Sequence, residues 1–508
     1  MLKLLLLLSV AACASCAGPY KILFYSPQFS PSHVKFVGGI ADFLVKAGHN
    51  VTVLMPKMSP IVSITGVKLA KIIFVPAAAE ASTLFIKQNM MNDVWSADLT
   101  FMKIQFMVDA FTATCRRVNE EKELLESLKE ENFDLMVAEL FDGCAFVELL
   151  HIPAHVITCA SSLMDNVAQL IGVPMFPSYV PGLMAPFPDK MTYIQRFLNM
   201  FMTYGASLFL NNILDSDTLL YRKLYGSNFT DLREVVAQTS FVLTNGEYLL
   251  DYPHPITHKV IEIAGLSFKN PQNLNKEWNK VLTARKRAIL VSFGSNVQSC
   301  NMTQPMKDSF LKLFDEFPDV TFIWKYECDD LPLDKHKNLF ISKWLPQIDI
   351  LGHKSLVAFI THGGMNSLVE TTRIGKPVVV IPLFGDQERN ANLLERAGIG
   401  IKVMKNNLEN HEVLHDAKAE SMSRMIRKKP FSPVDALIRH VEFAAEFGRL
   451  PFLDPVGRTM PFYKYFLLDI IIPILLLVIL IAFCILWCLY LVLRKFLRYV
   501  CAKKQKAE

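Results

Sequence analysis

The sequence lacks a large excess of charge of either sign. Its 508 residues include 53 Lys and Arg against 48 Asp and Glu, which leaves a formal net charge of only +5. Much of that excess lies in the basic stretch after residue 493, so the rest of the chain is close to neutral. No surface for nucleic acid is therefore indicated, and no nucleic acid is expected among the partners.

The cysteines lack a recognisable pattern. Of the ten in the chain, five lie between the two terminal apolar stretches: Cys115, Cys144, Cys159, Cys300 and Cys328. They are scattered and odd in number, with no Cys-x-x-Cys pair among them. Neither a disulfide framework nor a zinc site is predicted from them.

Charged residues are absent altogether from residues 470–493. At about 1.5 Å of rise per residue, a helix of this length exceeds the roughly 30 Å hydrocarbon core of a bilayer, so it is predicted to span a membrane. The basic tail at 494–508 is expected on the cytosolic side. Its last residues, 504–508, resemble a dilysine-type signal for return to the endoplasmic reticulum, although a merely solvated basic end is the alternative.

The first residues, 1–17, have the pattern of a cleavable secretory signal peptide, with Lys3 ahead of a Leu-rich core and small residues at Ser15 and Ala17. Together the two ends predict a single-pass type I protein of the endoplasmic reticulum membrane whose bulk lies in the lumen. The sequons at Asn228 and Asn301 are plausible glycosylation sites there.

The most informative stretch runs from Trp344 to Asn390. Residues 357–361 form a short apolar run typical of a buried parallel strand, and Gly363-Gly364 separates it from a helical pattern. His362, Asn366 and Glu370 are four residues apart and are expected along one face of that helix. The positive helix N-terminus suits a diphosphate, and a carboxylate two turns further on can accept hydrogen bonds from ribose hydroxyls.

The next predicted strand, 377–382, leads to Asp386 and Gln387. Ligands bind beyond the carboxyl ends of parallel strands, where a carboxylate beside a carboxamide can bind the hydroxyls of a hexose. Trp344 offers a flat surface on which uracil could stack, and Gln347 can contact the base or the ribose.

The start of the chain predicts a βαβ unit, with strands at 20–25 and 51–55. His33 is expected in the loop after the first strand, where catalytic groups such as a general base gather, although a surface His in a loop is more often only solvated. A base needs a carboxylate to orient it, and two compete: Glu139, at the end of a predicted strand, and Asp142. The spacing leaves both open, and either could instead cap the following helix.

The order and spacing of these residues resemble the signature of the UDP-glycosyltransferase family, the UDP-glucuronosyltransferases of the endoplasmic reticulum membrane. The resemblance extends to Ser292-Phe293-Gly294-Ser295, to residues 179–182 and to residues 430–433. Ser367 stands where vertebrate members usually have Gly. By resemblance, the donor contacts are Ser295, Trp344, Gln347, His362, Gly364, Asn366, Ser367, Glu370, Asp386 and Gln387. The resemblance also implies that His33 is the catalytic base and that Glu139 stands where the family usually has its catalytic Asp.

The resemblance implies an α/β fold of GT-B type: two Rossmann-like lobes, here followed by a C-terminal transmembrane helix. The predicted segments are a signal peptide (1–17), an acceptor-binding lobe (18–270), a linker (271–287), a UDP-sugar-binding lobe (288–448), a juxtamembrane segment (449–469), the span (470–493) and the tail (494–508). The segment 400–430 is shorter than the corresponding segment of family members usually is. Residues 191–210 could cover the acceptor pocket, rest on a bilayer or pack in the core.

The sequence thus predicts an inverting hexosyltransferase that moves glucose or glucuronic acid from a UDP-sugar to a hydroxyl of a small lipophilic acceptor. UDP-glucose is weakly favoured, because Thr244 stands near the position of an Arg in glucuronosyl members. No metal and no cofactor is expected. The alternative is a catalytically silent lumenal partner that binds UDP-sugars or lipophiles and modulates active paralogues, and homo- or hetero-oligomers are left open.

Overall fold

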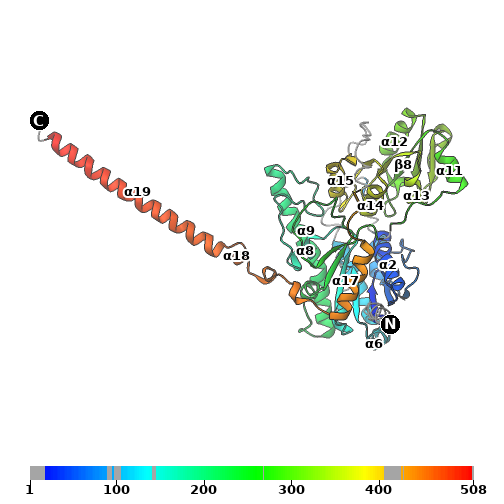
Figure 1. The fold of residues 1–508 in the computed structure, drawn as a ribbon, viewed down its shortest axis with the longest axis horizontal. Coiled ribbons are helices and arrows are strands. Elements are labelled where there is room, and N and C mark those ends of the chain that lie inside the picture. The colour runs from blue at the N-terminus through cyan, green and yellow to red at the C-terminus, as the bar shows by residue number, and fades with distance from the viewer. Residues whose placement is uncertain are drawn as a thin grey trace, which may run out of the picture. The chain divides into compact units, whose positions relative to one another are not determined.

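A computed structural model describes residues 18–87, 94–95, 105–139, 145–266, 268–405, 425–426 and 428–505. The predicted signal peptide, Asp142, Cys144 and most of the short 400–430 region lie outside the described residues. The chain divides into two units, 1–453 and 454–508, and the first unit holds two lobes, each built on one parallel sheet (Figure 1).

The first lobe has a seven-stranded sheet in the order β3-β2-β1-β4-β5-β6-β7. All of its strand pairs are parallel, and β1 lies between β2 and β4. The strands are β1 (Lys21–Tyr25), β2 (Asn50–Pro56), β3 (Lys71–Val75), β4 (Leu135–Glu139), β5 (His155–Cys159), β6 (Phe241–Thr244) and β7 (Val260–Glu262).

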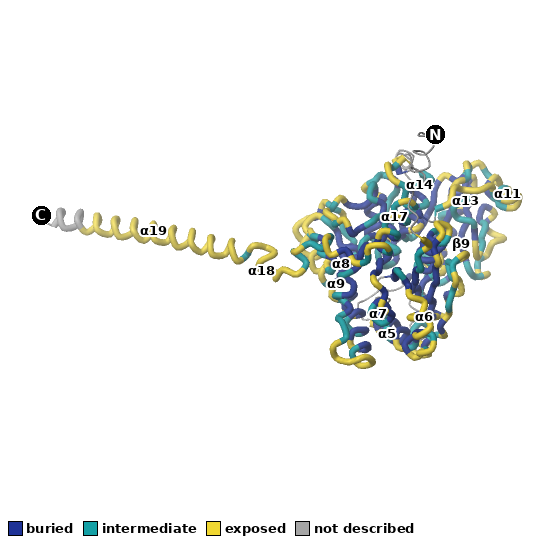
Figure 2. Tube along the Cα trace, turned by 60° about the horizontal axis from the view of Figure 1, so that its bottom comes forward, coloured by how far each residue is buried: buried dark blue, intermediate teal, exposed yellow. Residues whose placement is uncertain are grey.

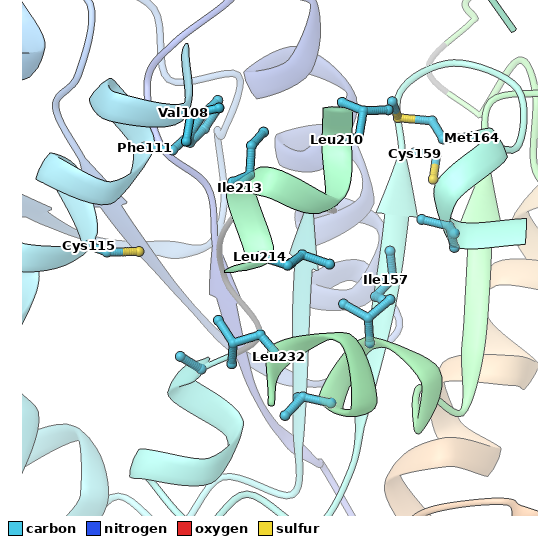
Figure 3. Close-up of a cluster of buried hydrophobic side chains, with 14 of the residues drawn as sticks. Val108, Phe111, Cys115, Ile157, Cys159, Met164, Leu210, Ile213, Leu214 and Leu232 are labelled. Atoms are coloured by element: carbon cyan, nitrogen blue, oxygen red, sulfur yellow. The ribbon is translucent and has the colours of Figure 1, made fainter. Parts of the chain in front are cut away.

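Both faces of this sheet are covered, because neighbouring residues of each strand point to opposite sides. In β1, Ile22 and Phe24 join the core beneath α2, while Leu23 and Tyr25 join the opposite core. Figure 3 shows the further cluster in which α5, α8, α9 and α10 pack over β5. The helices are α2 (Pro31–Lys46), α3 (Ala79–Lys87), α5 (Gln105–Glu120), α6 (Lys122–Glu130), α7 (Ala145–Leu149), α8 (Asp165–Leu170), α9 (Tyr193–Tyr225) and α10 (Leu232–Ala237).

Helix α9 has an unusual distribution of side chains in its N-terminal half. Asn199, Thr203 and Ser207 are buried, whereas Tyr193 and Leu208 are 73% and 67% exposed. The polar inner face has a structural task, since the Asn199 amide nitrogen donates to the carbonyl oxygens of Pro177 and Val180, at 2.7 and 2.9 Å. The inner face of this half is therefore packed against the lobe, with Ala206 and Leu210 also buried, while its outer face leaves large apolar side chains exposed.

The second lobe has a six-stranded parallel sheet in the order β10-β9-β8-β11-β12-β13. Its strands are β8 (Arg287–Ser292), β9 (Val320–Lys325), β10 (Leu339–Ser342), β11 (Leu356–Thr361), β12 (Val378–Val380) and β13 (Gly400–Lys402). Helices cover both faces: α11 (Lys276–Leu282), α13 (Gln347–Gly352), α14 (Met365–Ile374) and α15 (Gln387–Arg396) on one side and α12 (Gln304–Glu316) on the other. Helix α11 lies within the predicted linker, and its Leu282 is buried in the second-lobe core.

Helix α17 (Pro433–Phe447) returns to the first lobe. Its Leu437, Val441 and Ala444 are fully buried in the same core as Ile22 and Phe24 of β1. Ser432 caps the helix, since its hydroxyl accepts a hydrogen bond from the backbone of Asp435. The first lobe is thus completed by residues from the end of the globular unit.

The second unit contains α18 (Phe462–Tyr465) and the long helix α19 (Leu468–Gln505). Within α19, residues 468–498 are apolar and long enough to cross a membrane, and none of that stretch is buried (Figure 2). The prediction of two parallel α/β lobes and one apolar C-terminal helix that could span a membrane is confirmed.

One disulfide contradicts the sequence analysis, which predicted no disulfide framework. Cys300 and Cys328 are bonded, with their Cα atoms 5.8 Å apart. Cys300 follows β8 and Cys328 follows β9, so the parallel pairing of those two strands brings the cysteines together across 28 residues of sequence. Cys115 and Cys159 are buried and take no part in a disulfide.

Candidate active site

A cavity of about 610 Å³ lies between the two lobes, beyond the carboxyl ends of both sheets. His33 lines it from the first lobe. The ten residues predicted to contact the donor all line it as well: Ser295, Trp344, Gln347, His362, Gly364, Asn366, Ser367, Glu370, Asp386 and Gln387. The structure therefore brings the predicted set together, and their individual roles stay predictions.

His362 lies between two glycine-containing loops. Gly294, with φ of +81°, and Gly364 approach its ring so closely that a Cβ on either residue would fall 2.7 or 2.5 Å from a ring atom. Helix α14 begins only at Met365. His362 thus precedes the helix, and the prediction that it lies on one helical face with Asn366 and Glu370 was wrong. The Gly363 turn, with φ of +82°, ends the strand before the helix can start.

His362 is a neutral group at physiological pH. Burial, together with a smaller effect of the positive charge of Lys325, lowers its pKa to about 4. A neutral imidazole beside a helix N-terminus can still donate a hydrogen bond to a diphosphate oxygen. It brings no positive charge to that anion.

Glu370 and Gln347 form a polar pair at the other end of the cavity. The Gln347 amide nitrogen donates to Glu370 Oε2 at 2.7 Å, and it also lies 3.4 Å from the hydroxyl of Ser367. Burial raises the pKa of Glu370 to about 7, against the opposing effects of Gln347 and Lys35. Trp344, which follows β10, is 66% exposed, so its indole ring is accessible to a stacking base.

Asp386 and Gln387 stand where α15 begins. The Gln387 side-chain oxygen accepts hydrogen bonds from the backbones of Leu383 and Phe384, at 2.8 and 3.2 Å. This leaves its amide nitrogen as the group available to a ligand. Asp386 accepts from the Asn390 amide at 2.8 Å, and burial raises its pKa.

His33 lies in the first turn of α2, not in the preceding loop as predicted. The helix starts at Pro31, whose fixed φ suits the first helical position. The ring Nδ1 of His33 is hydrogen-bonded to Glu139 Oε1 at the end of β4. Glu139 is 4% exposed. This contact favours Glu139 over Asp142, which lies outside the described residues.

Contacts that cross the cleft were not predicted from the sequence. The Asn245 amide donates to Asn366 Oδ1 at 3.1 Å. Arg389, three residues after Asp386, pairs at 2.5 Å with Asp251 of the first lobe, and both side chains are buried. Lys35 of α2 reaches Trp344. No sequence pattern identifies such pairs, because they depend on how the two lobes meet.

The expectation of no metal overlooked one pattern, the triplet Asp215-Ser216-Asp217, since Asp-x-Asp is a metal-binding motif of some glycosyltransferases. Here the triplet lies within α9, far in sequence from the cavity-lining residues. Asp215 pairs with Arg233, and Asp217 accepts from the hydroxyl of Thr112 at 2.6 Å. Among the residues that the structure describes, no three His, Cys, Asp or Glu side chains form a group suited to a metal ion.

Comparisons with known proteins agree with this architecture. The family model described as UDP-glucoronosyl and UDP-glucosyl transferase matches residues 21–504. The chain is 28% identical to UDP-glycosyltransferase UGT5 of Dactylopius coccus, over 97% of this chain and 95% of that protein. It is 27% identical to mouse UDP-glucuronosyltransferase 2B17, over 92% of each.

Solved structures show the same fold. The glycotransferase of kitacinnamycin superposes with a TM-score of 0.52 at 16% identity, and the match covers 87% of this chain and all of that one. Glycosyltransferase SnogD from Streptomyces nogalater superposes with a TM-score of 0.51 at 18% identity. The two lobes therefore have the GT-B arrangement. Because the family model spans both lobes and continues through α19, the chain belongs to the UDP-glucuronosyl and UDP-glucosyl transferase family and is a glycosyltransferase.

Proposed function

We propose that this enzyme transfers a hexosyl unit from a UDP-sugar to a hydroxyl group of a small lipophilic acceptor, with inversion at the anomeric carbon. The observation that carries the proposal is the His33–Glu139 pair at a cavity whose opposite wall holds every residue predicted to contact the donor. A base on one lobe and a nucleotide site on the other suit a displacement across the cleft.

His33 acts as the general base. Its Nδ1 is engaged by Glu139, so Nε2 is the nitrogen that takes the acceptor proton. The acceptor oxygen then forms a bond to the anomeric carbon. The bond from that carbon to the diphosphate oxygen breaks, and its electron pair leaves with UDP. Attack from the face opposite UDP converts an α-linked donor into a β-glycoside. Glu139 stabilises the imidazolium that forms.

The departing diphosphate is held by the N-terminus of α14 and by neutral His362. Backbone amides of a helix N-terminus stabilise negative charge that develops on a leaving group. Glu370 and Gln347 bind the ribose, Trp344 stacks on uracil, and Asp386 with the Gln387 amide binds the hexose. No metal or cofactor is assigned a part in this scheme.

UDP-glucose is the preferred donor in this proposal. The carboxylate of glucuronic acid needs a cationic partner in a partly dry cleft. Thr244, near the position where glucuronosyl members carry an Arg, is buried at the end of β6. Arg389, the cation next to the hexose-binding residues, is already paired with Asp251. Rates with equal concentrations of UDP-glucose and UDP-glucuronic acid decide this point, and a clear preference for glucuronic acid overturns it.

The proposed location is the endoplasmic reticulum membrane, with both lobes in the lumen and α19 as the single span. The apolar stretch of α19 and the basic residues after it support this orientation. The Cys300–Cys328 disulfide is also typical of an oxidising compartment. Protease added to sealed microsomes should remove only the tail after residue 493, and digestion of the globular unit contradicts a lumenal orientation.

The activity is tested by UDP release in microsomes that contain the full chain, with each UDP-sugar paired with each of several phenolic acceptors. Hydrolysis is subtracted by omitting the acceptor, and His33→Ala serves as the matched inactive form. We expect acceptor-dependent UDP release from the natural chain alone. Release that equals that of His33→Ala with every pair, from a chain that still binds UDP, favours the silent-partner alternative.

A further inference from the structure

Lys35 is a residue of the acceptor lobe that reaches the donor side of the cleft. It lies in α2, two residues after His33, and lines the same cavity. Its Nζ is 5.0 Å from the centre of the Trp344 ring, which is the distance of a cation–π contact. Trp344 follows β10 of the opposite lobe, so this contact bridges the cleft.

The position of Lys35 is close to the nucleotide site. Its charge acts on Glu370, whose pKa it lowers against the larger effect of burial. Burial between the cleft walls lowers the pKa of Lys35 itself, and Glu370 opposes this. Within the described part of the chain, Lys35 has no carboxylate at ion-pair distance. Its ammonium is therefore available to a negatively charged ligand.

The second lobe supplies little positive charge to a bound anion. The UDP diphosphate is an anion, but His362 is neutral and contributes none. Lys325 also lines the cavity, yet its Nζ is paired with Glu327 at 2.5 Å. The N-terminus of α14 supplies only the partial charge of a helix dipole. Two further lysines line the cavity, Lys269 and Lys35, and of these Lys35 contacts a residue predicted to bind the donor, Trp344.

We propose that Lys35 is a donor-binding residue supplied by the acceptor lobe: when a UDP-sugar binds, its ammonium leaves Trp344 and pairs with the diphosphate. This inference rests on the proposed function, because it takes the cavity to be the UDP-sugar site. It adds a coupling between the lobes. Lys35 and His33 share the first turns of α2, so a diphosphate that holds Lys35 also fixes the helix that positions the base.

The test is calorimetric titration of the full chain in detergent with UDP and, separately, with uridine. Lys35→Met keeps the length of the side chain and removes its charge, while Lys35→Arg keeps the charge. We expect Lys35→Met to bind UDP about 10-fold more weakly, the scale of one charge-assisted hydrogen bond, and to bind uridine as the natural chain does. Lys35→Arg should restore most of the UDP affinity.

Lys46→Met is the matched control. Lys46 ends the same helix and lies over the Phe43 ring at 5.2 Å, but it does not line the cavity. Its replacement should leave UDP binding unchanged. Kinetics give a second measurement, in which Lys35→Met raises KM for the UDP-sugar more than it lowers kcat.

Three outcomes overturn the inference. Equal UDP affinity in Lys35→Met and the natural chain removes Lys35 from the donor site. Tighter UDP binding by Lys35→Met means that the lysine obstructs the uracil position. Equal losses for UDP and uridine mean that it contacts the nucleoside and not the diphosphate. Failure of the natural chain to bind UDP at all is a different result, since it contradicts the proposed function itself.

Discussion

The two walls of the cleft each present a histidine, and their surroundings are opposite. On the first-lobe wall, the His33 side chain is 25% exposed and hydrogen-bonded to a buried carboxylate, Glu139. On the second-lobe wall, His362 is enclosed by glycine loops, and burial lowers its pKa to about 4. A carboxylate neighbour stabilises an imidazolium, whereas burial without one prevents it from forming. The same side chain is therefore prepared to accept a proton on one wall and to remain neutral on the other.

The largest expected effect is the loss of the base. His33→Ala should lower the rate of transfer by about 10³-fold, because no other imidazole or carboxylate of the described first-lobe residues lines the cavity, while UDP affinity stays nearly unchanged. Steady-state rates and calorimetric UDP binding measure the two parts. His336→Ala is the control, since His336 pairs with Asp315 at 2.8 Å outside the cavity. Loss of transfer and UDP binding together would show that His33 does not act as a base.

Removing the carboxylate should have the next largest effect. Glu139→Gln keeps a hydrogen-bond acceptor for Nδ1 but no longer stabilises the imidazolium, so kcat should fall by about 10²-fold. Asp142→Ala, measured beside it, should lower kcat much less. A larger loss in Asp142→Ala would assign the orienting role to Asp142.

The role of His362 on the second-lobe wall can be tested by placing a methyl group against its ring. Gly294→Ala puts a Cβ 2.7 Å from His362 Cε1 at a positive φ, so the imidazole must move. We expect about 10-fold weaker UDP binding and a loss of about 1–2 kcal/mol in the free energy of unfolding. Gly48→Ala is the control, because Gly48 also has a positive φ but a Cβ there meets nothing within 4 Å. If both variants bind UDP normally, the position of His362 does not determine donor affinity.

The smallest effect concerns stability. Burial raises the pKa of Glu370 to about 7, above its ordinary value of 4.5. Between about pH 4.5 and pH 7, Glu370 keeps its proton in the native state but has lost it in the unfolded chain. The free energy of unfolding therefore falls as the pH rises through this range. Without nucleotide, Glu370→Gln should be more stable than the natural chain by about 1 kcal/mol at pH 8 and no more stable at pH 4. Thermal unfolding at both pH values measures this, and an equal difference at the two contradicts it.

The sequence predicted the fold and the residues that line the second-lobe wall of the cavity, because the signals for both are local. An apolar strand, two glycines and a helical pattern occur in order between residues 356 and 374, and the structure has β11, a turn and α14 there. The errors for the two histidines concerned the residue at which a helix begins. His362 and His33 were each assigned to the wrong side of a helix start, although Pro31 marked the start of α2.

Other features could not be predicted, because they depend on tertiary structure. The Cys300–Cys328 bond requires β8 and β9 to pair, which no cysteine spacing reveals. The Arg389–Asp251 pair and the Lys35–Trp344 contact require the two lobes to face each other. Sequence reasoning chose the residues of each wall separately and had no information on which ones meet.

The return of α17 to the first sheet limits how this enzyme can be divided or recombined. The first lobe is not a continuous piece of sequence, since Leu437, Val441 and Ala444 complete a core begun by Ile22 and Phe24. A chain cut within residues 271–287 would leave that core open to water and would give the other fragment an unpaired apolar helix. A chimera that exchanges first lobes between relatives must therefore exchange residues 433–447 together with the N-terminal half.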